Sequence, residues 1–218
     1  RIESSAASDV YKRQVSGVSE VGTSKIVKNS IYRGMARSCI RGQWPHSCNK
    51  CWKCFRKQLI EDAIDGRTMS DKEFIKSINS REVVRKLMSR FVPHENVLAW
   101  AVQSMKRGPI LNSFYEQLVG STYDTSHLTS FYEPSLDLIP TKYQSFVRQE
   151  LLKHLLPMDD NTGKRMLEQD FTEYMTSETH ENNVAIFRKK IPYLSKKFAT
   201  WTAPLSLFSP ARDPISKS

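Results

Sequence analysis

The sequence predicts a mainly α-helical protein in which a metal-binding loop with four cysteines precedes a helical domain. All four cysteines lie within residues 39–54, so residues 55–218 contain none. Beyond them, apolar residues recur at the three- and four-residue spacing of amphipathic helices. Hydrophobic residues make up 39% of the chain and charged residues 26%, the balance of a globular protein rather than a disordered one. No apolar run approaches the roughly 20 residues needed to span a bilayer, so we expect no membrane partner.

The first 14 residues do not read as part of the natural protein. Residues 1–14 (RIESSAASDVYKRQ) lack an initiator Met, and SSAASDVYKRQ resembles translated adaptor sequence that recurs at the ends of reading frames in environmental assemblies. We therefore interpret them as a sequencing artefact and expect natural sequence upstream of Val15; a disordered natural tail is the alternative. The expected division is then a metal-binding segment (15–66), a helical extension (67–203) and a flexible tail (204–218).

The spacing Cys39-x8-Cys48-x2-Cys51-x2-Cys54 is that of a structural zinc site. Zinc takes four ligands at the corners of a tetrahedron, and cysteines two residues apart supply neighbouring corners when the chain turns tightly between them. In one continuous helix the last three cysteines would fan over about 120° and climb roughly 9 Å, too far for one ion. The spacing therefore requires a turn among them.

We place this turn at Asn49 and Lys50, and we expect a helix to begin close to residues 51–54. The first cysteine then approaches from the far side of a loop over residues 41–47, where Gly42 and Pro45 suit an irregular path. Thiolates at the start of the helix would face the positive end of its dipole.

Other uses of the cysteines remain open. An iron–sulfur cluster is the main rival, since Cys-x2-Cys-x2-Cys also occurs in ferredoxin-type ligation. Two disulfides are the second, although no secretory signal is present and a reducing cytoplasm is the default location. His46 is also placed to replace one cysteine as a ligand.

The net charge of +10 favours an anionic partner only weakly, because basic residues are spread along the chain. Four of them surround the cysteines, where a site with four thiolates would carry a charge of about minus two. These four either offset this charge or bind phosphate or nucleic acid. They are Lys50, Lys53, Arg56 and Lys57.

Helical patterns fill most of the remaining sequence. Phe55, Leu59 and Ala63 predict a helix that ends before Gly66. Ser70-x-x-Glu73 predicts a capping box. An apolar stripe follows before Pro93, consisting of Val84, Leu87, Met88 and Phe91. Further helices are expected over residues 94–105, 111–119, 143–156 and 183–189, with a long loop over 121–141.

The cysteine spacing, preceded by SGVSEVGTSKIVKNS and followed by WKCFRK, resembles the C-terminal end of the 7-cyano-7-deazaguanine synthase family. The resemblance covers about residues 15–57. Cys39, Cys48, Cys51 and Cys54 match the zinc ligands of the family. Upstream of them, Ser19, Glu20 and Thr23 match a family motif, and the resemblance implies that they lie on the substrate side or are only part of that motif. In that family this segment follows an α/β ATP-binding domain of the PP-loop type.

The resemblance implies that the parent protein is an ATP-dependent ligase that uses ATP with Mg to adenylate a carboxylate and insert nitrogen into a deazapurine or related substrate. Such enzymes hold pyrophosphate with an S-G-G-x-D-S loop, which is absent from these 218 residues. We therefore expect the ATP-binding domain to be missing from this chain and the chain alone to be inactive, with no catalytic residue of its own. The members of that family end soon after the last cysteine, so the parent is expected to be a divergent relative.

The alternative function is a zinc-knuckle module that binds nucleic acid without catalysis. Tryptophans supply faces for base stacking and basic residues supply charge. The residues concerned are Trp44, Trp52, Arg33, Arg37, Arg41, Lys50, Lys53, Arg56 and Lys57.

Overall fold

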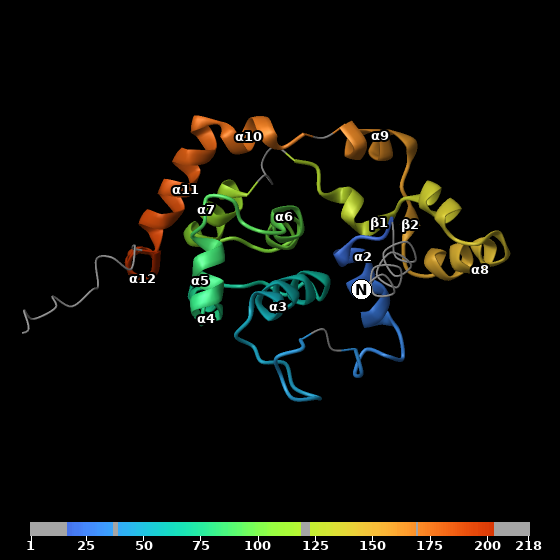
Figure 1. Cartoon of the computed structure of the whole chain (residues 1–218), viewed down its shortest axis with the longest axis horizontal. Coiled ribbons are helices and arrows are strands. Elements are labelled where there is room, and N and C mark those ends of the chain that lie inside the picture. Colours follow the sequence, from blue (N-terminus) through green and yellow to red (C-terminus); the bar gives the residue numbers. More distant parts are fainter. Residues whose placement is uncertain (1–16, 37–38, 119–122, 169, 203–218) are drawn as a thin grey trace, which may run out of the picture.

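The computed structural model of the chain describes residues 17–36, 39–118, 123–168 and 170–202. These residues are mainly helical, which confirms the predicted fold class (Figure 1). The predicted flexible tail and N-terminal artefact lie outside the described residues. Among those described, no helix combines the length and the apolar character that crossing a membrane requires.

The described helices follow one another along most of the chain. The α-helices are α2 (Glu20–Asn29), α3 (Trp52–Ile64), α4 (Asp71–Ser77), α5 (Arg81–Leu87), α6 (Glu95–Gln103), α7 (Pro109–Gln117), α8 (Thr141–Leu152), α9 (Asp160–Glu168), α10 (Thr172–Thr176), α11 (Glu178–Lys190) and α12 (Pro192–Thr202). Two 3-10 helices, η2 (Ser126–Thr129) and η3 (Glu133–Leu138), and two short strands, β1 (Ser130–Phe131) and β2 (Leu156–Pro157), complete the described elements.

The helix boundaries follow local sequence signals. The Ser70 side chain accepts a hydrogen bond from the Glu73 N–H, and the Glu73 carboxylate accepts one from the Ser70 N–H, so the predicted capping box is confirmed. The predicted end of α3 is also confirmed, because Gly66 has a φ of +65° just beyond it, a conformation that glycine adopts without steric cost. Each signal satisfies polar groups that a helix end leaves unpaired.

One hydrophobic core joins the helix that carries the cysteines to the helices that follow it. The core extends from Trp52 and Phe55 on α3, through α4 to α7, to Phe187 on α11 and Leu194 on α12. Helix α3 packs mainly on α6, and α11 packs mainly on α7. The predicted segments 15–66 and 67–203 therefore share one packed interior.

The first described helix packs against residues far along the sequence. Val18 forms an isolated antiparallel bridge with Phe131, and β1 pairs with β2 in parallel. The Ser19 hydroxyl donates a hydrogen bond to the Leu128 carbonyl at 2.5 Å. In Figure 1, α2 accordingly lies beside β1, β2 and α8, while the long connection to α3 loops out at one edge of the molecule.

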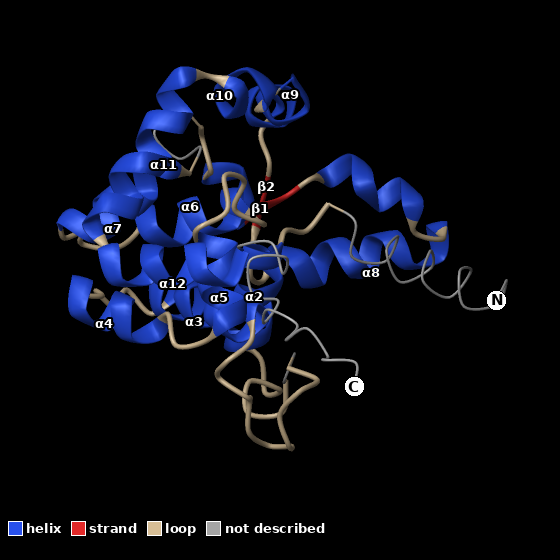
Figure 2. Ribbon diagram, turned by 60° about the vertical axis from the view of Figure 1, so that its left-hand side comes forward, coloured by secondary structure: helices blue, strands red, loops and turns tan. Residues whose placement is uncertain are grey.

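Two details of the sequence prediction are wrong. Phe91 does not continue the apolar stripe, because α5 ends at Leu87 and the Phe91 side chain is 49% exposed. Residues 123–141 are not an open loop: they form η2, β1 and η3, and bury Leu128, Phe131 and Leu136. Helix α8 buries none of its residues and extends away from the body in Figure 2.

Candidate metal centre

The four cysteines converge on one point, although Cys39 is nine residues from the next cysteine. Their sulfur atoms all lie within 4.8 Å of one another. The Sγ atoms of Cys48 and Cys54 are 3.8 Å apart, and those of Cys51 and Cys54 are 3.5 Å apart. An ion with metal–sulfur bonds of about 2.3 Å places tetrahedral ligands about 3.8 Å apart. The cluster therefore has the dimensions to bind one metal ion.

The turn predicted between the cysteines forms at Asn49, whose φ is +52°. Asparagine is among the few residues other than glycine that tolerate this left-handed conformation. Helix α3 then begins at Trp52, and Cys51 is its N-cap. The Cys51 sulfur accepts a hydrogen bond from the Cys54 N–H at 3.4 Å. The helix start thus fixes two of the four ligands.

Gly42 allows the first cysteine to return to the other three. A β-carbon at this position would stand 2.2 Å from the His46 carbonyl oxygen and 2.8 Å from the Cys48 nitrogen. Any other residue would therefore push the loop open. The close approach also lets the Cys48 N–H donate a hydrogen bond to the Cys39 sulfur at 3.4 Å.

The backbone around the cluster favours two thiolates. The Cys48 N–H lowers the pKa of Cys39 to about 6, and the Lys50 N–H likewise lowers the pKa of Cys48. Burial instead raises the pKa of Cys54 to about 12. Four thiols this close resist deprotonation together, so binding a metal ion would release protons from the cluster.

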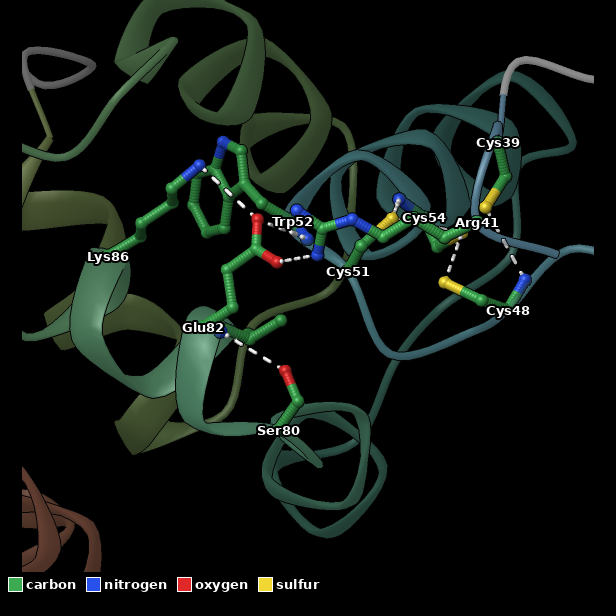
Figure 3. Close-up of polar contacts among 10 residues, drawn as sticks. Cys39, Arg41, Cys48, Cys51, Trp52, Cys54, Ser80, Glu82 and Lys86 are labelled. Atoms are coloured by element: carbon green, nitrogen blue, oxygen red, sulfur yellow. Dashed lines mark hydrogen bonds and ion pairs between the residues drawn. The ribbon is translucent and has the colours of Figure 1, made fainter.

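Glu82 on α5 holds the cysteine loop against the helical core (Figure 3). Its carboxylate forms an ion pair with Arg41 in the loop and accepts a hydrogen bond from the Trp52 N–H at 3.3 Å. Lys86, one turn further along α5, lies 3.5 Å from the same carboxylate. Burial alone would raise the pKa of Glu82, but the hydrogen bonds from Arg41 and the Trp52 N–H, together with the charges of Arg41 and Lys86, outweigh it and leave the pKa lowered. Glu82 is therefore held as an anion.

A second contact supports the turn itself. The Asn79 side-chain amide, in the connection between α4 and α5, donates a hydrogen bond to the Asn49 carbonyl at 3.0 Å. The region around α5 thus contacts the cysteine loop on both sides of Cys48.

The family of the chain follows from its sequence. The model of a protein family described as "Family of unknown function (DUF6395)" matches residues 6–170. The chain belongs to the DUF6395 family. The match begins within the segment 1–14 and takes in the cysteine loop and the helices through α9. No curated protein and no solved structure gives a significant match.

We expect Glu82→Gln to loosen the cysteine loop of this DUF6395 protein. The change keeps the shape of the side chain but removes the ion pairs with Arg41 and Lys86. Residues that orient a ligand set indirectly contribute about tenfold or more to metal affinity, so we expect the affinity of the cluster for a metal ion to fall about tenfold. Competition with a chelator measures it. Glu173→Gln, on the exposed first turn of α10, is the control, and equal affinities for the two variants would contradict this role.

Ser19, Glu20 and Thr23 meet at the start of α2, next to α3. Ser19 is the N-cap and accepts a hydrogen bond from the Gly22 N–H at 2.9 Å. The Thr23 hydroxyl donates to the Ser19 carbonyl at 2.8 Å. Glu20 reaches across to Arg56, where Oε2 lies 2.8 Å from Nε and Oε1 accepts a hydrogen bond at 3.0 Å. Glu20 therefore connects α2 to α3, whereas Ser19 and Thr23 hold the start of α2.

The basic residues expected to surround the thiolates divide into two groups. Arg56 is 7% exposed and bound to Glu20, and Lys57 lies 3.5 Å from the same carboxylate. Both therefore pair with Glu20, and their part in offsetting the thiolate charge stays a prediction. Lys50 and Lys53 are exposed, and Arg37 lies outside the described residues.

The two tryptophans also differ. Trp44 is 74% exposed, whereas Trp52 is 3% exposed and stacks on Phe55 with ring centroids 5.4 Å apart. Trp52 is thus a core residue and offers no face to a base. His46 is exposed and does not belong to the cysteine cluster.

The sequence offered no sign of the roles of Glu82 and Asn79. Glu82 lies 41 residues beyond Arg41 and 30 beyond Trp52, and Asn79 lies 30 residues beyond Asn49. The only local signal, a helix start after Ser80 with an acidic residue in its first turn, is common to helices with no such contact.

Proposed function

We propose that the four cysteines bind a structural zinc ion and that the chain is the C-terminal part of a cytoplasmic ATP-dependent ligase of the PP-loop type. The convergence of the four sulfurs within 4.8 Å carries the zinc assignment. Four protein ligands complete a tetrahedron and leave no position for water or substrate, which is the arrangement of structural rather than catalytic zinc.

Geometry favours a single ion over the alternatives. In an iron–sulfur cluster the thiolates surround a core of several atoms, whereas sulfurs this close leave room for one ion. All four cysteines are free, and the sulfurs of Cys51 and Cys54 at 3.5 Å are far beyond the roughly 2.05 Å of a disulfide. Thiolate sulfur is a ligand that zinc prefers.

The ligase assignment rests on the resemblance of residues 15–57 to the deazaguanine nitrile synthases. The motif residues support it, because Glu20 forms an ion pair from α2 to Arg56 on the helix that carries Cys54, while Ser19 and Thr23 hold the start of α2. In this proposal ATP, Mg and the purine-like substrate bind an N-terminal domain outside these 218 residues. The metal-bound loop and its helices are a rigid platform against which that domain packs.

Two measurements test the proposal. Elemental analysis of the purified chain should give one zinc per chain, and cobalt substituted for zinc should show the intense charge-transfer band of a four-thiolate site; one iron per chain would overturn the zinc assignment. DNA upstream of the Val15 codon should encode an S-G-G-x-D-S loop in frame. A start codon within a few residues of Val15, with no such loop, would overturn the ligase assignment.

Binding of nucleic acid is the second candidate function, and the exposure of Trp44 and Lys50 in the cysteine loop favours it. The burial of Trp52 and the pairing of Arg56 and Lys57 with Glu20 weigh against it. Such binding would weaken steeply as salt rises. Gel-shift measurements at low salt with single-stranded and duplex oligonucleotides distinguish the two candidates, since the platform described above binds neither.

A further inference from the structure

A groove runs between α2 and α3, beside the metal centre. It has a volume of about 770 Å³ and is walled by α2, by the turn at residues 33–36 and by the exposed side of α3. A smaller cavity of about 300 Å³ adjoins it, lined by Cys39 and Cys54 among others, and the two share Ala36, Lys57 and Glu61. The groove is thus continuous with the cysteine loop, and its volume is in the usual range of pockets for small molecules.

Positive charge exceeds negative charge within the groove. Its lining includes three carboxylates, Glu20, Glu61 and Asp65, and five basic residues, Lys28, Arg33, Lys53, Arg56 and Lys57. A concave surface lined with an excess of one sign of charge concentrates the opposite charge in the adjoining solvent. The groove therefore attracts anions.

Ion pairs between its own walls fix three of the five basic residues. Glu20 on α2 binds both Arg56 and Lys57 on α3, and Lys28 on α2 forms an ion pair with Asp65 at the end of α3. Lys57 also donates a hydrogen bond to the Ser24 hydroxyl at 2.8 Å. These contacts hold the walls of the groove in place before any ligand arrives, which lowers the entropic cost of binding.

Two basic residues remain without an ion pair to any residue that the structure describes. These are Arg33 on the turn and Lys53 in the first turn of α3, and both side chains are exposed. Arg33 attracts Asp65 only at long range. A guanidinium and an ammonium that face one groove without partners suit a phosphate group, which arginine binds in a bidentate manner and lysine as a point charge.

We propose that this groove binds the phosphate groups of a small nucleotide, with Arg33 and Lys53 as the contacting cations. The Glu61 carboxylate lies in the same lining, is exposed and can accept hydrogen bonds from the amino groups of a base. Val27 and the Thr23 hydroxyl complete the α2 wall. The groove thus combines cations for phosphate with acceptors and apolar surface for a nucleoside. The site goes beyond the proposed function, which assigns zinc but no small-molecule ligand to this chain.

Calorimetric titration of the zinc-loaded chain with ADP tests the proposal, with adenosine and inorganic pyrophosphate as further probes. We expect ADP and pyrophosphate to bind and adenosine to bind at least tenfold more weakly, because a hydrogen bond to a charged group is worth about tenfold or more in affinity. The double variant Arg33→Ala/Lys53→Ala should lose at least about tenfold in ADP affinity. Arg33→Lys should retain part of it.

The matched control is Lys189→Ala/Lys190→Ala on α11, which removes the same charge from exposed positions on another helix. This control should bind ADP as the unaltered chain does. An equal loss in both double variants would overturn the proposal, because it would indicate attraction to the net charge alone. Equal affinities for ADP and adenosine would also overturn it. Binding of a single-stranded oligonucleotide without binding of ADP would replace it with recognition of a strand.

The metal content of the same samples separates this proposal from the function proposed above. One zinc per chain without ADP binding would reject the groove site and leave the metal assignment intact. ADP binding by a chain that contains iron, or no metal, would reject the zinc assignment and leave the groove site intact.

Discussion

We expect Cys51→Ser to abolish stoichiometric zinc binding and to cause the largest loss of stability of any single change in the cysteine loop. Structural zinc sites in small peptides contribute on the order of 10 kcal/mol of metal-linked folding free energy. Serine is a good N-cap, so the variant keeps a hydrogen-bond acceptor for the Cys54 N–H at the start of α3. The loss of stability then measures the contribution of the metal ion and not that of the N-cap hydrogen bond. Zinc content and thermal melting with and without a chelator measure it.

The variant should unfold the loop and leave α3 in place. Phe55 and Leu59 on α3 are buried at 5% and 1% exposure in the common core, and burial of such side chains does not depend on the metal. Hydrogen exchange should therefore speed up over residues 39–51 and change little over the rest of α3. His46→Ser, in the same loop but outside the cysteine cluster, should retain one zinc. Full zinc content and unchanged melting of Cys51→Ser would contradict a structural metal site.

The sequence predicted the parts of the structure that depend on near neighbours. The apolar spacing of Phe55, Leu59 and Ala63 was enough to identify α3, because the side of the helix that they form is buried. The cysteine spacing was enough to predict one point of convergence, since a tight turn brings sulfurs together wherever the rest of the chain lies. Both predictions rest on geometry within one short stretch of the chain.

The parts that the sequence did not predict depend on distant contacts. Strands β1 and β2 have two residues each, too few to show the alternation by which strands are recognised. Helix α2 buries Val21 in a cluster with Ile60, Val97 and Leu128. Ser19 and Val18, at its start, contact Leu128 and Phe131, more than a hundred residues away. Phe91 matched the helical spacing but lies beyond the end of α5. The contacts of Glu82 likewise join elements whose proximity only the folded chain creates.

We expect Phe114→Ala on α7 to destabilise the whole molecule by about 3–5 kcal/mol, the range for removing a large buried aromatic side chain. The Phe114 ring is fully buried, and its centroid lies 5.2 Å from that of Phe74 on α4 and 5.3 Å from that of Phe187 on α11. The cavity would thus open where three helices meet. Domains of this size are stable by about 5–15 kcal/mol, so the loss is a large fraction of the total. Urea denaturation followed by circular dichroism measures it.

The control is Phe146→Ala on α8, whose ring is 63% exposed and which should change stability by no more than about 0.5 kcal/mol. The comparison also tests whether α3 and the later helices unfold together. They share one core, so Phe114→Ala should lower two urea midpoints together: the midpoint at which zinc is released and the midpoint at which helicity is lost. Without urea, the zinc content should stay at one per chain. Zinc release at an unchanged midpoint would show instead that the metal-binding segment folds independently of the helices packed on it.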